Sequence, residues 1–220
     1  MDRFPRNETL LETFQWRIEQ SSDDIAFKFN DRETTYKEYD QKANRVANGI
    51  IAEGCSPNSR VAVLAKNSDM YAEIMFGSLK SRTALVGLNW RLAAPEVVFV
   101  VNDSESEVLF VGPDFYELVD SIKDEFSHVR QIIAMEDDHD SWQSYESWRD
   151  SFEDTDPKLK GNADDDVIQL YTSGTTGHPK GVRLTNKNVN ASTPMVEETW
   201  GKDWHEKSVN FVLSPLFHIA

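Results

Sequence analysis

The sequence predicts an α/β fold in which a mostly parallel sheet is buried between flanking helices. From residue 60 onward, candidate strands alternate with candidate helices, which is the order that a parallel sheet requires. The strands are continuous apolar runs at 60–65, 84–88, 108–111 and 131–135, and strands of that kind are buried on both faces. The chain has 220 residues, of which 39% are hydrophobic, enough to bury a real core.

Before residue 60 the chain predicts a helix at 10–18, a strand at 25–29, a turn and a second short strand. Thr35 and Glu38 form a capping box, in which each residue bonds to the backbone of the other. The helix that they open is expected to end at Gly54. Its buried side is expected to comprise Tyr39, Ala43, Val46, Ala47, Ile50 and Ile51.

Helices are also expected between the later strands. One runs from residue 67 to about residue 80, Pro95 opens a second, and Pro113 begins a third, because proline is tolerated in a first helical turn. A late apolar strand at 167–170 delivers a loop, and Thr185 caps a helix that follows this loop.

The segment 136–166 is the most acidic part of the chain, with twelve acidic and three basic residues. We expect a solvated excursion or linker there. A metal site at 164–166 is a weak alternative, because consecutive carboxylates at a strand entrance point in different directions. Four aromatic residues at helical spacing predict an amphipathic helix within the segment: Trp142, Tyr145, Trp148 and Phe152.

The composition excludes several classes of protein. A net charge of -15 argues against nucleic-acid binding, which needs a basic surface. The single cysteine, Cys55, excludes an internal disulfide framework and fits a reducing compartment, and we interpret it as a small structural residue. Because no apolar run approaches the length of a membrane span and the first residues do not resemble a signal peptide, we expect a cytoplasmic protein without a transmembrane segment.

The most informative stretch is 171–182, which reads YTSGTTGHPKGV. It combines hydroxyl side chains, glycines that let backbone N–H groups approach an anion, and one lysine, so it suits a polyphosphate. A Walker A loop is excluded. That motif ends in Gly-Lys followed by Ser or Thr, whereas here Pro179 precedes Lys180 and Gly181 follows it.

The order Tyr-Thr-Ser-Gly-Thr-Thr-Gly-x-Pro-Lys-Gly resembles the phosphate-binding loop of the AMP-forming acyl-CoA synthetases, within the adenylate-forming superfamily. Residues 35–54 and 79–92 are similar to early motifs of that family. Residues 213–220 resemble a later motif, in which a proline, an aromatic residue and a histidine border the acyl-carboxylate site. The aspartates at 164–166 are also typical, so they need no metal. The resemblance covers roughly residues 8–220.

Two residues depart from the family pattern: Arg82 stands where a glycine is usual, and Asn186 where a histidine is common. The length departs further, since relatives are more than twice as long. The resemblance implies an N-terminal portion of the AMP-binding large domain, without the mobile C-terminal domain. We expect a first α/β subdomain at about 1–135, the acidic linker at 136–166, and the loop strand, a helix and the start of the acyl-site motif at 167–220.

The resemblance implies an enzyme that activates a carboxylic acid with ATP and Mg²⁺, forming acyl-AMP and pyrophosphate, and then makes the coenzyme A thioester. Lys180 would stabilise the departing pyrophosphate, and His218 would border the reacting carboxylate. Thr175 would ligate Mg²⁺. The residues that would hold the phosphates are Thr172, Ser173, Gly174, Thr175, Thr176, Gly177 and Lys180.

Alternatives to this function remain open. The chain could belong to a ligase that serves a carrier protein, to an amino-acid adenylating enzyme, or to a non-catalytic nucleotide-binding fragment. Phe217 and His218 favour fatty or aryl acids over amino acids. For His218 a hydrogen-bonded core histidine is the competing interpretation.

Overall fold

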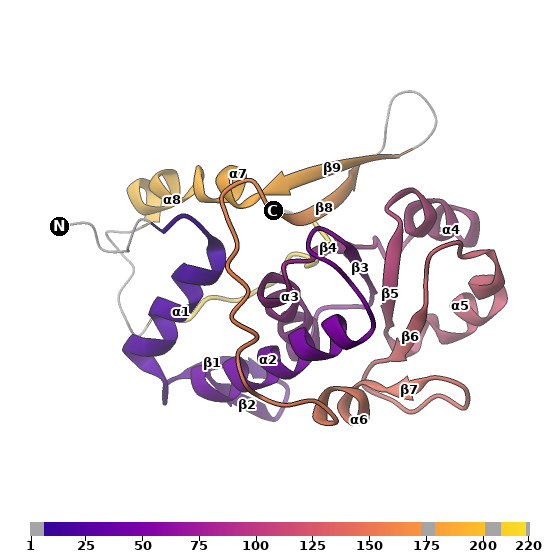
Figure 1. The fold of residues 1–220 in the computed structure, drawn as a ribbon, viewed down its shortest axis with the longest axis horizontal. Helices are drawn as coiled ribbons and strands as arrows, with labels where there is room; N and C mark the ends of the chain where they lie inside the picture. The colour runs from indigo at the N-terminus through magenta and orange to yellow at the C-terminus, as the bar shows by residue number, and fades with distance from the viewer. Residues whose placement is uncertain (1–6, 173–178, 201–207, 219–220) are drawn as a thin grey trace.

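The structure is a computed structural model that describes residues 7–172, 179–200 and 208–218. Its sheet contains β3 (Arg60–Leu64), β4 (Ala84–Gly87), β5 (Ser106–Val111), β6 (Gln131–Ala134), β7 (Gln143–Ser144), β8 (Asp166–Thr172) and β9 (Lys180–Thr185). The strand order is β7-β6-β5-β3-β4-β8-β9 (Figure 1). Each neighbouring pair is parallel except β8–β9, which is antiparallel. The predicted mostly parallel sheet is therefore confirmed.

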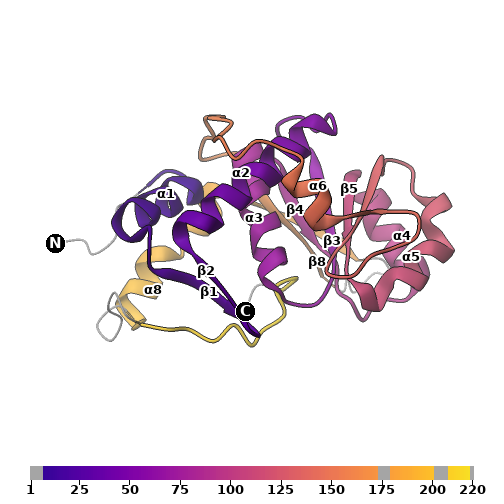
Figure 2. The ribbon, with the colours of Figure 1, turned by 90° about the horizontal axis from the view of Figure 1, so that it is seen from below.

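The helices that cover the sheet are α2 (Tyr36–Ala52), α3 (Asp69–Ser81), α4 (Ala94–Asp103), α5 (Tyr116–Ile122) and α6 (Tyr145–Asp150), with 3-10 turns η1 (Pro113–Phe115) and η2 (Lys123–Glu125) beside α5. Successive residues of a strand point to opposite faces. On β3, Val61 and Val63 pack with α2, α3 and α6. Ala62 and Leu64 pack with α4 and α5 on the other face. Figure 2 shows the sheet between these two groups of helices, which confirms strands buried on both sides.

A smaller layer lies outside α2 and α3 and consists of α1 (Leu10–Ser21), β1 (Ile25–Phe29) and β2 (Arg32–Thr35) (Figure 2). β1 and β2 form the expected antiparallel pair. Phe14 of α1 packs edge-on against Tyr39 of α2, with ring centroids 5.1 Å apart. This aromatic contact joins the layer to the helices that cover the main sheet.

Both ends of α2 follow from the sequence. Thr35 Oγ1 accepts from the Glu38 backbone N–H at 3.2 Å, and the Thr35 N–H donates to Glu38 Oε2 at 2.8 Å, so the capping box is confirmed. Gly54, with φ of 83°, follows the helix end. Ile51 was expected on the buried side but is 37% exposed. At 3.6 residues per turn, it lies roughly 100° from the centre of the apolar stripe.

Part of the acidic segment belongs to the sheet and its core, which corrects the expectation of a solvated excursion over the whole of 136–166. β7 pairs with β6, and Trp148 of α6 is 1% exposed. The expected helix between Trp142 and Phe152 is shorter than predicted, because α6 covers only 145–150. Trp142 packs on the α4–α5 face of the sheet and Trp148 on the opposite face, so one helical side cannot hold both.

The β8–β9 hairpin leads into α7 (Asn186–Asn190) and α8 (Thr193–Trp200). β9 is a strand that the sequence did not predict, since the loop was expected to lead directly into the helix. The cap of that helix is confirmed, because Thr185 Oγ1 accepts from the Asn188 N–H at 3.3 Å. Within the described ranges, none of the helices has both the length and the apolar character needed to cross a bilayer.

Candidate functional site

The β8–β9 hairpin pairs the residues that flank the predicted phosphate loop. Tyr171 lies opposite Gly181, and Thr172 lies opposite Lys180, in the last two pairs of the ladder. The register therefore brings Thr172 and Lys180 together at the carboxyl end of β8, where open α/β sheets bind ligands. The remaining predicted phosphate-binding residues lie outside the described part of the chain: Ser173, Gly174, Thr175, Thr176 and Gly177.

Lys180 and Thr172 are both exposed at this end of the hairpin. In the described part of the hairpin, the ion pair on β9 is made by Arg183 and not by Lys180. An ammonium group without a carboxylate partner can bind a phosphate as a point charge, and the threonine adds a hydroxyl donor. The two residues thus offer a cation and a donor on either side of the loop.

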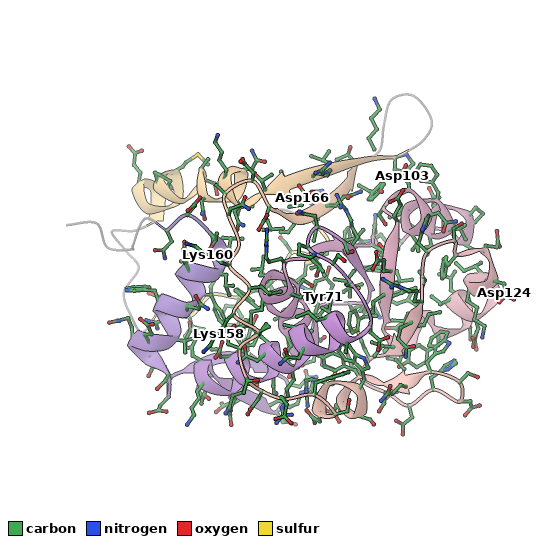
Figure 3. The ribbon with its side chains drawn as sticks, viewed as in Figure 1. Tyr71, Asp103, Asp124, Lys158, Lys160 and Asp166 are labelled. Atoms are coloured by element: carbon green, nitrogen blue, oxygen red, sulfur yellow. The ribbon has the colours of Figure 1, made fainter. Side chains whose placement is uncertain are left out.

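A buried carboxylate fixes the opposite end of the hairpin. Asp166 is the first residue of β8 and is 3% exposed. It accepts from Arg60 Nη2 at 2.9 Å and from Arg183 Nε at 2.7 Å. Because Arg60 belongs to β3 and Arg183 to β9, Asp166 joins three strands at one point. Figure 3 shows it where β8 enters the sheet.

The neighbouring Asp165 is held by a two-bond contact with Arg82, at the end of α3. Arg82 Nε and Nη2 donate to the two carboxylate oxygens at 3.0 and 2.9 Å. Burial acts to raise the pKa of Asp165, but hydrogen bonds from Arg82 and Asn162 outweigh it and leave the pKa lowered. Arg82 has φ of 58°, in the left-handed region. Glycine adopts that region without strain, which explains the glycine expected at this position.

These ion pairs argue against a metal site at 164–166, because arginines from three elements neutralise Asp165 and Asp166. Among the described residues, no group of three or more His, Cys, Asp or Glu side chains is arranged to hold a metal. Thr175, the predicted Mg²⁺ ligand, lies outside them.

Asn186, the other departure from the family pattern, is a buried structural residue. Its Oδ1 accepts from the Leu10 N–H at 3.1 Å, and its Nδ2 donates to the Asn162 carbonyl at 3.0 Å. It therefore connects the start of α7 to α1 and to the segment before β8.

His218 comes from the far end of the chain. Its neighbour Phe217 is 9% exposed and contacts Trp90, with ring centroids 6.4 Å apart. A Cβ added to Gly87, the last residue of β4, would lie 2.8 Å from the Phe217 Cα. Because β4 and β8 are adjacent and parallel, this segment lies at the same edge of the sheet as Thr172. His218 itself is exposed in the described part of the chain, which does not favour the interpretation as a core histidine.

A polar network beneath the hairpin was missed by sequence reasoning. Tyr171 donates its hydroxyl hydrogen to Asp103 Oδ2 at 2.6 Å and accepts from Gln169 Nε2 at 3.0 Å. Gln169 Oε1 accepts in turn from Arg60 Nε at 3.0 Å. Asp103 is the last residue of α4 and lies below the open end of the hairpin in Figure 3. No local pattern relates it to Tyr171, which lies 68 positions later.

Cys55 is a structural residue, as interpreted from the sequence. It is buried, with 8% of its surface exposed. Burial and the neighbouring Glu107 raise the pKa of its thiol to about 12. A thiol that keeps its proton is a poor nucleophile.

The chain matches the model of a family described as AMP-binding enzyme over residues 14–220. It is 36% identical, over 226 aligned residues, to a fatty acid–acyl-carrier-protein ligase, ScoC, of Streptomyces coeruleorubidus, and the match covers 100% of this chain and 42% of ScoC. It is 34% identical over 188 residues to a feruloyl-CoA synthase of Amycolatopsis sp, with 84% of this chain and 35% of that protein covered.

A solved structure supports the same relationship. The inhibitor-bound N-terminal domain of FACL13 from Mycobacterium tuberculosis superposes with a TM-score of 0.74 at 32% identity, covering 82% of this chain and 45% of that one. The chain thus spans about two fifths of the length of the curated relatives given above.

Proposed function

Because the chain belongs to the AMP-binding enzyme family, we propose that it forms part of a ligase that activates a fatty or aryl acid with ATP. A carboxylate oxygen attacks the α-phosphorus of ATP, the bond between the α- and β-phosphates breaks, and acyl-AMP and pyrophosphate form. The sulfur of coenzyme A then attacks the acyl carbonyl, the thiol proton is lost, and AMP leaves. The products of the second step are the thioester and AMP.

The single observation that supports this proposal best is the pairing of Thr172 with Lys180 at the open end of the hairpin. In the first step a negatively charged carboxylate approaches a triphosphate that repels it. The protein must therefore fix donors and cations around the phosphates before the reaction begins. Lys180 meets this demand as an exposed cation on a strand that Asp166 anchors to the sheet.

Further roles are part of the same proposal. Ser173, Thr175, Thr176 and backbone N–H groups of the loop would hold the phosphates, and Thr175 would also ligate Mg²⁺, which neutralises phosphate charge when bound. His218 would border the carboxylate of the acid. The proposed location is the cytoplasm, on the ground that Cys55 is a single, buried cysteine.

A carrier protein is the second candidate for the acyl acceptor. ScoC, which is similar over the whole of this chain, is named as a ligase of fatty acids to the acyl carrier protein. The similarity to the feruloyl-CoA synthase instead supports coenzyme A as the acceptor. Acceptors can be compared directly by adding coenzyme A or holo-acyl carrier protein to the intact protein after acyl-AMP has formed. Transfer to one acceptor and not to the other identifies the class of acceptor that the enzyme uses.

Replacing Lys180 tests the first step. Lys180→Ala in the intact protein is expected to lower carboxylate-dependent ATP–pyrophosphate exchange by about 100-fold or more, because a fixed donor to the developing charge is lost. Lys187→Ala is the matched control, since Lys187 is an exposed lysine on the adjacent α7. An unchanged exchange rate in Lys180→Ala would refute the role of this residue. Absence of exchange in the unaltered protein, with a panel of fatty and aryl acids, would refute the function itself.

A further inference from the structure

The hydroxyl of Tyr171 ties the open end of the hairpin to a helix on the α4–α5 face of the sheet. Tyr171 belongs to the next-to-last pair before the loop, and its hydroxyl donates to Asp103 Oδ2 at 2.6 Å. Burial and the Asp103 carboxylate raise the pKa of Tyr171, so the hydroxyl keeps the proton that it donates.

An acidic residue is unfavourable at the position of Asp103, and its bond to Tyr171 offers a reason for the carboxylate. Asp103 is the last residue of α4, whose final turn contains no basic side chain. A carboxylate at the C-terminus of a helix is repelled by the helix dipole. The Tyr171 hydroxyl is a donor that offsets this repulsion and holds Asp103 against the hairpin.

Gly181 provides the space that the Tyr171 ring occupies. It lies opposite Tyr171 in the ladder. A Cβ at this position would lie 3.0 Å from the ring Cζ, 3.1 Å from the hydroxyl oxygen and 2.6 Å from Gln169 Nε2. A side chain there would displace the ring or the amide. The glycine that follows Lys180 thus serves the packing of Tyr171, whatever contact its backbone makes with phosphate.

We propose that Tyr171, Asp103 and Gly181 are positioning residues, which set the orientation of Thr172 and Lys180, the two residues that flank the phosphate loop, relative to the sheet. The proposal rests on the function proposed above. The hydrogen bonds continue from Tyr171 through Gln169 and Arg60 to Asp166. Side chains from both ends of β8 are therefore connected in one network. Thr172, the residue next to Tyr171, flanks the loop directly. Loss of the Tyr171 contact is therefore expected to displace Thr172 and Lys180 more than the buried strands at the centre of the sheet.

The test removes the tie in the intact protein and measures each kinetic constant separately. Tyr171→Phe and Asp103→Ala should each raise the KM for ATP about 10-fold, because a small displacement near reacting groups is costly, while the KM for the acid stays within about twofold. Asp103→Asn retains an acceptor oxygen and should recover most of the loss. Gly181→Ala should raise the KM for ATP in the same way.

A double variant and a control separate positioning from general stability. If the two residues act through one bond, Tyr171→Phe combined with Asp103→Ala should raise the KM for ATP no further than either single variant does. Tyr39→Phe removes a hydroxyl that donates to the Ala72 carbonyl at 2.8 Å, far from the loop in the chain, and should leave the KM for ATP unchanged. Additive losses, an unchanged KM for ATP in Tyr171→Phe, or an equal rise in Tyr39→Phe would each overturn the proposal. Absence of carboxylate-dependent ATP–pyrophosphate exchange in the unaltered protein would overturn the proposed function instead.

Discussion

The centre of the sheet and its β8–β9 edge are built by different interactions. β3, β4 and β5 are almost wholly buried, and their side chains enter apolar clusters on both faces. β9 is exposed over Lys180–Arg183 and is held mainly through β8 and the Arg183–Asp166 pair. Burial of apolar surface therefore stabilises the centre, whereas hydrogen bonds and ion pairs orient the edge.

The difference explains how a fold with a tightly packed centre can still present exposed polar residues at one edge. An apolar core is stabilised collectively and tolerates little change in shape. The hydrogen bonds of Asp166, Asp165 and Tyr171 contribute less to stability, but their geometry fixes how the hairpin is oriented on the sheet. Segments that bind ligands are commonly drawn from the less stable parts of a protein. The candidate site lies on the exposed edge of the sheet, where β9 is solvent-accessible over 180–183.

The largest effect should come from breaking the centre. Phe110 of β5 is 0% exposed and lies 5.4 Å from Trp148 between ring centroids. Phe110→Ala should lower the free energy of unfolding by about 3–5 kcal/mol through lost burial and the cavity left behind. Val182→Ala on β9, where the valine is 43% exposed, should change it by about 0.5 kcal/mol or less. Urea unfolding followed by tryptophan fluorescence measures the free energy of unfolding of both variants. Equal decreases would contradict the difference between the centre and the edge of the sheet.

An intermediate effect is expected where α3 meets the segment before β8. Arg82→Ala keeps the left-handed backbone strain and loses both hydrogen bonds to Asp165. It should therefore lower the free energy of unfolding by about 1.5–3 kcal/mol. Arg82→Gly loses the same bonds but relieves the strain, and should be about 1 kcal/mol more stable than Arg82→Ala. Thermal unfolding of the two variants measures the difference. If the alanine variant were the more stable one, the strain argument would be wrong.

The smallest effect concerns pH. The pKa of Asp165 is lowered in the folded state, so its ionisation adds stability that is complete above the unfolded pKa of about 4 and is lost as the pH falls through the folded value. Asp165→Asn cannot ionise. The stability difference between the unaltered protein and this variant should therefore be constant from about pH 7 to pH 5 and shrink below about pH 4. A difference that grows on acidification would reverse the assigned sign.

Much of the fold could be predicted because its signals are local. The apolar runs of the central strands, the capping box at Thr35 and the prolines that open helices each act within a few residues. β9 was missed because Lys180, Gly181 and Arg183 make it look like the end of a loop. Its pairing with β8 decides its structure, and pairing is not a property of the strand alone.

The candidate site was predictable only in part. Residue order predicted the loop and Lys180 as a phosphate site, and that role stays a prediction; the structure adds the register that places Thr172 opposite Lys180. The partners of the hairpin could not be identified in the same way. Asp103, Arg60 and Arg82 reach β8 or its approach from α4, β3 and α3, and each contact depends on the tertiary arrangement of elements that are distant in sequence.

The buried thiol of Cys55 has a practical consequence for spectroscopy. Maleimide and iodoacetamide reagents react with accessible thiolates, and this protonated, enclosed sulfur should be nearly inert to them. A cysteine introduced at the exposed position of Val182 would then take up a fluorophore or spin label selectively, with the native sequence otherwise kept. A reporter on β9 would test whether the environment of the hairpin changes when ATP, the nucleotide proposed above, is added.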